Sequence, residues 1–193
     1  MTAIRTKLPR ASQERLWEPG RVTHEISEGA IHRSLDEAAR SELAGLSGVR
    51  EKVVGALKQP KPLDICMPVL NAVLAAQYYE VFGALQLPRT MAVYEPCVGG
   101  SNPVIIATEA YGGGKATYLA INLNRKLREE LRGKTAHLAT PIRIIEDNAQ
   151  RALGHLAPRS FDVACFHHAV NDILQTAVSE PRGMDTTSID WFP

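Results

Sequence analysis

The sequence predicts an α/β protein in which a helical N-terminal segment precedes a doubly wound, mostly parallel sheet. Apolar residues recur at helical spacing through much of the first 88 residues, whereas from Thr90 onward apolar runs of strand length alternate with helical segments. Successive strand and helix units with short connections imply a parallel sheet covered on both faces. We therefore divide the chain into residues 1–88, an arm followed by helices, and residues 89–193, the sheet domain.

The N-terminal part is predicted to begin as an arm and to continue as helices. Residues 1–33 are polar and interrupted by proline and glycine, which indicates an extended arm with at most short helical pieces. Apolar residues then recur at helical spacing, and Gly45 and Gly48 predict a split into two helices. A longer helix is expected to start near Pro68 and to stop before Pro88.

Strands and helices are predicted to alternate in the sheet domain. The strands are expected at 91–94, 117–122, 142–145 and 161–166. The helices are expected at 103–111, 125–132, 149–156 and 172–179, with the glycines at 112–114 and 133 as helix stops. Right-handed crossovers would bring the carboxyl ends of the first and fourth strands to one crevice, where such folds bind ligands.

Four strands are fewer than doubly wound sheets commonly contain. The chain reaches Pro193 soon after the fourth predicted unit, and Trp191 and Phe192 stand where a further strand could begin. We therefore expect C-terminal strands to be missing, as in a fragment, a truncated chain or a sheet completed by another segment.

The turn after the first predicted strand is a candidate ligand-binding loop. Gly99 and Gly100 permit positive φ angles and a close approach of a ligand to the backbone. Asn102 can cap a helix that begins at Pro103, since proline is favoured at the first helical position. Amide groups at a helix start attract anionic or oxygen-rich ligands. The turn therefore predicts either a plain strand-to-helix connection or a cofactor cradle.

The same loop carries a resemblance to a known family. Glu95, Cys97, Gly99 and Ser101 have the spacing of the E/D-x-G-x-G-x-G loop that ends the first strand in class I S-adenosylmethionine-dependent methyltransferases. Over about residues 88–180 the chain resembles this family, which implies a Rossmann-like sheet. The helix-rich segment before it resembles the region with which many members cover their substrate, which implies an N-terminal helical cap. The chain departs from the pattern where Cys97 and Ser101 replace glycines.

The resemblance implies S-adenosylmethionine as cofactor and a set of cofactor-binding residues at the strand ends. Asn122 stands where the family usually has an acid that holds the ribose hydroxyls, and this neutral residue is a third departure. Asp147 and Asn148 stand where the adenine is commonly met, and FDVACFHHAV resembles the motif of the fourth strand. The full set is Glu95, Cys97, Val98, Gly99, Gly100, Ser101, Asn102, Asn122, Leu123, Asp147, Asn148 and His167.

The resemblance implies an enzyme that transfers a methyl group to an oxygen or nitrogen of a small molecule by in-line displacement. Glu95 would steady the loop and meet the cationic amino-acid end of the cofactor. His168 directly follows the fourth predicted strand and is the candidate catalytic base, with packing at the strand end as the alternative role. The rival hypothesis is a catalytically silent binding or assembly module that keeps the fold. A nicotinamide dehydrogenase is a weaker third hypothesis, because the three-glycine fingerprint is absent.

Charge and motif content narrow the choice of partners. A net charge of +1 provides no broad basic field for nucleic acid or anionic membranes. The FHHA motif also lacks the Asn-Pro-Pro-aromatic pattern of methyltransferases that act on nucleic-acid bases, which favours a small-molecule acceptor. No His, Cys and carboxylate cluster has zinc-like spacing, so no metal is expected. Tyr78, Tyr79 and Phe82 on the long helix indicate core packing, a dimer interface or a substrate pocket.

The cysteines and the N-terminus predict a cytoplasmic protein. Cys66, Cys97 and Cys165 are widely spaced and odd in number, which argues against a disulfide framework. The N-terminus lacks the apolar core of a signal peptide, and no later segment has the roughly 20 uninterrupted apolar residues that span a membrane.

Overall fold

The computed structural model describes residues 18–58, 67–100, 102–152, 154, 156–157 and 160–167. These residues form two compact units. The first holds the described residues up to Arg89 together with Pro103–Gly113, and the second holds Thr90–Asn102 and the described residues from Gly114 onward. The predicted division at residue 88 falls beside this junction, but the helix at 103–112 groups with the N-terminal helices.

The first unit is helical. Its elements are α2 (Pro19–Ser27), α3 (Ala30–Ser34), α4 (Glu37–Gly45), α5 (Val49–Lys58), α6 (Met67–Ala84) and α7 (Pro103–Gly112). Helix α6 packs most extensively against α7 and also contacts α2, α3, α4 and α5. Buried alanines at 72, 75 and 76 of α6 allow this close approach, because their side chains add little bulk. The helical prediction for the N-terminal part is confirmed over the described residues.

Aromatic side chains join α6 to α7. The ring of Tyr111 makes edge-to-face contacts with Tyr79 and Phe82, each at a centroid distance of 5.9 Å, and its hydroxyl donates to Leu87 O at 2.7 Å. Phe82 is 1% exposed. Of the three roles considered for the aromatic residues of this helix, Phe82 therefore has the core role, and pairing of two chains through these helices stays a prediction.

The polar N-terminal part is more helical than the sequence predicts. Residues 1–17 lie outside the described residues, but α2 and α3 bury Val22, Ile26 and Ile31. These apolar residues are spaced so that each short helix buries one face. The segment is polar overall, so this spacing is difficult to recognise in the sequence. Gly48 adopts a φ of 68° between α4 and α5, which confirms the predicted split of the next helical segment.

The second unit contains a parallel sheet. Its strands are β1 (Ala92–Pro96), β2 (Thr117–Ile121), β3 (Ile142–Ile145) and β4 (Val163–Ala164), and its helices are α8 (Arg125–Thr135) and α9 (Ala149–Ala152). Within the described residues all strand pairs are parallel and the order is β3-β2-β1-β4, so β1 and β4 are neighbours, in agreement with the expectation that their carboxyl ends lie together. This α/β architecture is compatible with a Rossmann-like fold.

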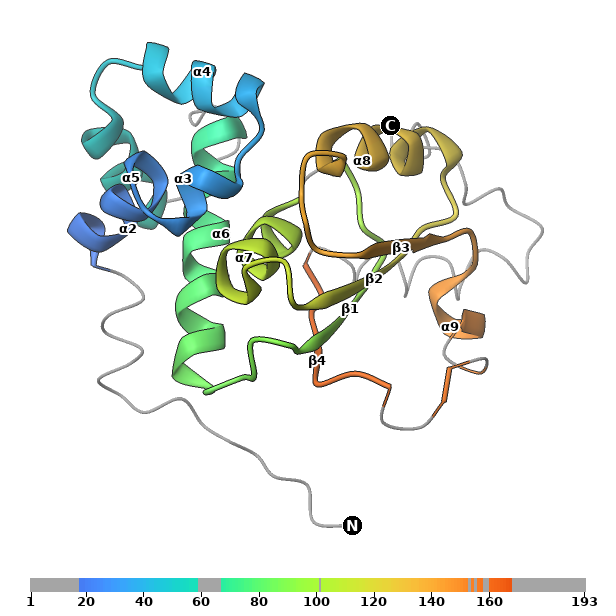
Figure 1. The fold of residues 1–193 in the computed structure, drawn as a ribbon. Helices are drawn as coiled ribbons and strands as arrows, with labels where there is room; N and C mark the ends of the chain where they lie inside the picture. Colours follow the sequence, from blue (N-terminus) through green and yellow to red (C-terminus); the bar gives the residue numbers. More distant parts are fainter. Residues whose placement is uncertain are drawn as a thin grey trace. The chain divides into compact units, whose positions relative to one another are not determined.

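The winding of the chain reverses after β3. From β2 the chain moves to β3 at one edge of the sheet, and from β3 it crosses back over β2 and β1 to β4 at the other edge. Because these two crossovers run in opposite directions and both are right-handed, α8 and α9 lie on opposite faces of the sheet (Figure 1). On the α9 face, Tyr94, Leu119, Ile121 and Ala152 form a buried cluster. Phe161 stacks on Tyr94 at a centroid distance of 5.1 Å and closes this cluster.

Helix ends follow the glycine signals only in part. Gly113 and Gly114, with φ of 59° and 77°, end α7 as predicted. Gly133 does not end α8, which continues to Thr135, because Leu131 and Thr135 stay buried on its inner face. The predicted helix at 172–179 lies outside the described residues. Among the residues that are described, no helix is both long and apolar enough to cross a membrane.

Candidate functional site at the carboxyl edge of the sheet

The carboxyl ends of the four strands lie along one edge of the sheet, because all strand pairs are parallel. We call the residues that follow the strands at 97–100, 122–124, 146–148 and 165–167 the carboxyl edge. Parallel sheets of this kind bind ligands at the carboxyl ends of their strands, next to the point where the winding reverses. That point lies between β1 and β4. The predicted cofactor-binding residues from Glu95 to Gly100 therefore share this edge with those that follow β2, β3 and β4.

Two predicted site residues cannot be placed. Ser101 and His168, the candidate base, lie outside the described residues. His167 follows β4 on the carboxyl edge. Within the described part of the chain, no group of three or more His, Cys, Asp and Glu side chains is arranged to hold a metal ion.

The loop after β1 turns at Cys97 and not at its glycines. Cys97 adopts a φ of 57°, whereas neither Gly99 nor Gly100 has a positive φ, so the turn does not use the positive angles that these glycines permit. The sharp turn comes directly after Pro96, and Val98 N then donates to Ile121 O at 3.3 Å, which returns the loop to the end of β2. The left-handed residue thus stands where the E/D-x-G-x-G-x-G pattern has its first glycine.

Replacing Cys97 with glycine should stabilise the protein. A left-handed conformation costs an L-residue about 1–2 kcal/mol, and glycine avoids this cost. Glycine also has more freedom in the unfolded chain, which favours unfolding and offsets about 0.5–1 kcal/mol of the stabilisation. We expect Cys97→Gly to raise the free energy of unfolding by about 0.5–1 kcal/mol over Cys97→Ala, measured by urea denaturation. Cys97→Ala is the matched control because it also removes the thiol but retains Cβ. Equal stability of the two variants would contradict a strained Cys97.

Glu95 is buried at the end of β1. Its side chain is 2% exposed, and its Oε2 atom has no hydrogen-bond partner among the described residues. Burial raises the pKa of Glu95 well above its usual range, because an isolated charge is poorly solvated there. The register Tyr94↔Ala164 places Cys165, the first residue after β4, beside Glu95 of β1. Burial, together with the nearby Glu95 carboxylate, raises the pKa of the Cys165 thiol to about 12.

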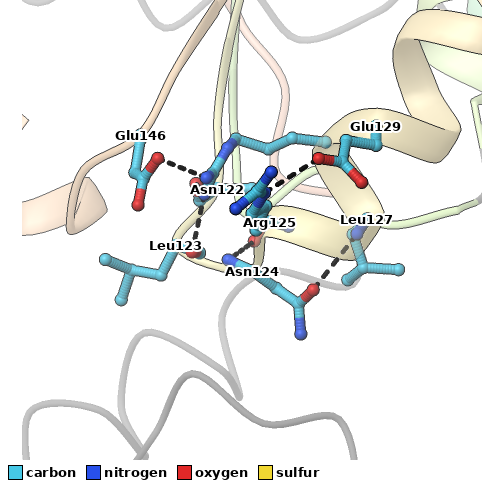
Figure 2. Close-up of polar contacts among 8 residues, drawn as sticks. Asn122, Leu123, Asn124, Arg125, Leu127, Glu129 and Glu146 are labelled. Carbon is cyan, nitrogen blue, oxygen red and sulfur yellow. Dashed lines mark hydrogen bonds and ion pairs between the residues drawn. The ribbon is translucent and has the colours of Figure 1, made fainter.

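Asn122 at the end of β2 is a structural link. Its Nδ2 donates to Val98 O in the first loop, and its Oδ1 accepts from Asn124 N at 2.6 Å. Asn124 in turn caps α8, since its Oδ1 accepts from Leu127 N at 3.1 Å (Figure 2). Both polar atoms of the Asn122 amide are therefore bound to main chain. Leu123 lies in the same turn.

Arg128 of α8 connects the ends of β2 and β3. Its side chain is 3% exposed, and Nη1 donates to Asn122 O at 2.9 Å and to Leu123 O at 2.6 Å. Nη2 forms an ion pair with Oε2 of Glu146, whose side chain is 69% exposed. Sequence reasoning missed both residues. The signal for Arg128 was its spacing from Leu131 and Thr135, which places a charged residue on the buried face of an otherwise polar helix.

The residues after β3 begin α9. Asp147 Oδ1 accepts from Asn148 N at 2.7 Å and lies 3.7 Å from Arg151 Nε. Asn148 is buried, and its carbonyl accepts from Ala152 N at 2.9 Å. The two predicted adenine-binding residues thus lie on the carboxyl edge, but both also take part in the turn into α9.

A cavity of about 630 Å³ lies away from this edge, towards the amino ends of the strands. Its lining includes Ala92, Thr117, Pro141, Leu156 and Phe161. We place the candidate site at the carboxyl edge because the unpartnered Glu95 oxygen, the left-handed Cys97 and the polar turn residues lie there. Most of the cavity-lining residues named above are apolar.

Comparisons of the chain with protein-family models, with curated proteins and with solved structures found no match. The class of the protein is therefore defined by its own structure. It is an α/β protein with an all-parallel sheet over the described residues, compatible with a Rossmann-like fold. Its candidate site is the carboxyl edge of that sheet.

Proposed function

We propose that the chain is a cytoplasmic S-adenosylmethionine-dependent methyltransferase that acts on an oxygen or nitrogen of a small-molecule acceptor. The observation that carries this proposal is the left-handed Cys97 directly after β1, two residues beyond a buried acid. The chain bends there without glycine, at the position where the methyltransferase-like loop has its first glycine. The proposal includes an N-terminal helical cap and further C-terminal strands.

The residues on the carboxyl edge fit this cofactor in two respects. Glu95 Oε2 has no partner among the described residues, so an ammonium group could satisfy it. Apart from Gly99 itself and its two chain neighbours, no described atom lies within 4 Å of the place where a Cβ on Gly99 would stand, so a ligand could approach the main chain there. An ammonium beside Glu95 would favour the carboxylate form and lower its raised pKa.

The chain's own residues would position and enclose the reactants. The cofactor, when bound, supplies a methyl group already activated by a sulfonium. The protein then has to hold the acceptor atom in line and keep water away. Asn122 contributes by tying the first loop to the turn before α8. His168, the candidate base, lies outside the described residues, and its role stays a prediction.

The alternative function is a catalytically silent binding or assembly module. The observation that favours it is the engagement of Asn122. A neutral amide whose polar atoms already bind main chain offers a ribose diol less than a carboxylate would. Ligand binding separates the two functions.

Titration calorimetry with S-adenosylmethionine and S-adenosylhomocysteine tests the proposal. We expect micromolar or tighter binding, about −8 kcal/mol, and we expect Gly99→Leu to abolish it without loss of cooperative folding, because the added side chain enters open space. Gly133→Leu is the matched control. It makes the same change at an exposed glycine of α8 that also has open space around it, and binding should be unaffected.

Two results would contradict the proposal in different ways. A cooperatively folded wild-type protein that binds neither ligand would favour the silent module. If Gly99→Leu binds the ligands as tightly as wild type does, the ligand does not bind at the loop after β1.

A further inference from the structure

The carboxyl edge carries a candidate diol-binding group that the resemblance to methyltransferases does not indicate. A ribose ring donates two hydrogen bonds from adjacent hydroxyls, and a carboxylate accepts such a pair best. At the end of β2 the available side chain is Asn122, whose amide is engaged by Val98 O and Asn124 N. The acid must therefore come from a neighbouring strand end.

Glu146 occupies that neighbouring position. Ile121 and Ile145 are partners in the register of β2 and β3, so Asn122 and Glu146 are the first residues beyond the same pair. Asn122 N donates to Ile145 O at 3.1 Å, which keeps the two strand ends together at this level. The Glu146 carboxylate thus lies one strand away from the amide it would replace.

The buried guanidinium of Arg128 orients the Glu146 carboxylate. It holds Oε2 of Glu146 while also donating to the carbonyl oxygens of Asn122 and Leu123. Since the Glu146 side chain is 69% exposed, its other oxygen is open to a ligand. A carboxylate fixed by a buried arginine loses less side-chain entropy on binding than a mobile surface acid.

The other acids on this edge are less suitable. Glu95 is buried and its pKa is raised by burial, so it is a poor acceptor for a solvent-facing diol. Asp147 already accepts from Asn148 N and lies beside Arg151.

We propose that the Glu146 carboxylate, positioned by Arg128, accepts hydrogen bonds from the ribose diol of a nucleoside ligand bound at the carboxyl edge. This inference rests on the proposed function, because it specifies how the adenosyl group would be held. It assigns the ribose contact to the end of β3 and leaves Asn122 as the link between the first loop and α8.

The test compares S-adenosylhomocysteine with its 2′,3′-dideoxy analogue, which lacks both hydroxyls. Wild type should bind the diol ligand at least 10-fold more tightly, because hydrogen bonds to a charged acceptor are stronger than those to a neutral one and the analogue lacks both donors. Glu146→Gln should bring this ratio close to one while binding of the dideoxy analogue stays within about 2-fold. The glutamine keeps an oxygen that can accept from Arg128, so the fold should be retained.

Two further variants complete the test. Glu129→Gln removes an exposed carboxylate of α8 that pairs with Arg125 and should leave the ratio as in wild type. Glu146→Asp, which retains the charge on a shorter side chain, should give an intermediate ratio.

Three outcomes would overturn the inference. If Glu146→Gln weakens both ligands equally, Glu146 has only a structural role. If wild type binds both ligands equally, the diol is not recognised. If wild type binds neither ligand, the proposed function fails as well, and this result is distinct from the other two.

Discussion

Arg128→Met should lower the free energy of unfolding by about 2–4 kcal/mol. The guanidinium is 3% exposed and donates to Asn122 O and Leu123 O while pairing with Glu146. Methionine fills much of the same volume but leaves both carbonyl oxygens without these donors. We place the loss below the largest values for broken buried ion pairs, because Glu146 is largely solvated and can return to water.

Urea denaturation of Arg128→Met and Arg125→Met provides the measurement and its control. Arg125 lies three residues earlier on α8, its side chain is 84% exposed, and it pairs with Glu129 one turn away. Removing this surface pair should leave the denaturation midpoint unchanged within error. Equal effects of the two substitutions would show that the contacts of Arg128 with the ends of β2 and β3 do not stabilise the fold.

At pH values above the ordinary titration range of a carboxyl group, Glu95→Gln should be more stable than wild type. Its free energy of unfolding should also depend less on pH than that of wild type. Burial raises the pKa of Glu95 in the folded state above that in the unfolded chain, so the folded state retains a proton that the unfolded state releases. The associated stability is fully present below the unfolded pKa and is lost as pH rises through the folded pKa. Between these two values the loss is at most about 1.4 kcal/mol per pH unit.

Urea unfolding between pH 5 and pH 8 measures this effect as the difference between Glu95→Gln and wild type. The difference should grow with pH, because glutamine cannot ionise. Glu129→Gln is the control: its carboxylate has a pKa lowered by Arg125, so it titrates below this range and its difference from wild type should stay flat. A flat difference for Glu95→Gln would contradict a neutral, buried Glu95 in the folded protein.

The sequence by itself predicted the described strands and helices of the sheet domain, although several of their ends differ from the predicted bounds. The third strand was predicted at its observed bounds, 142–145, and α7 begins at Pro103 as expected. The sequence also predicted that the carboxyl ends of β1 and β4 border one crevice, and in the observed order the two strands are neighbours. These features depend on local periodicity, on glycine and proline signals and on a general chirality rule, all of which are visible without the fold.

The candidate site was predicted as a set of strand ends, and within the described residues these ends do share one edge. What each side chain does there was decided by the tertiary structure. Asn122 was predicted to hold a ribose, but its amide ties two loops together. Nothing in the order of residues indicates that Val98 O would reach this amide, since the two residues are 24 positions apart.

The tertiary structure alone also decided where the backbone bends and which charges meet. The positive φ belongs to Cys97 although two glycines follow it closely, because the chain must turn directly after Pro96 to bring Val98 N to Ile121 O. Arg128 and Glu146 lie 18 residues apart, and they meet because the register of β2 and β3 places their turns side by side. Such contacts depend on the packing of segments distant in sequence, and local residue patterns do not encode that packing.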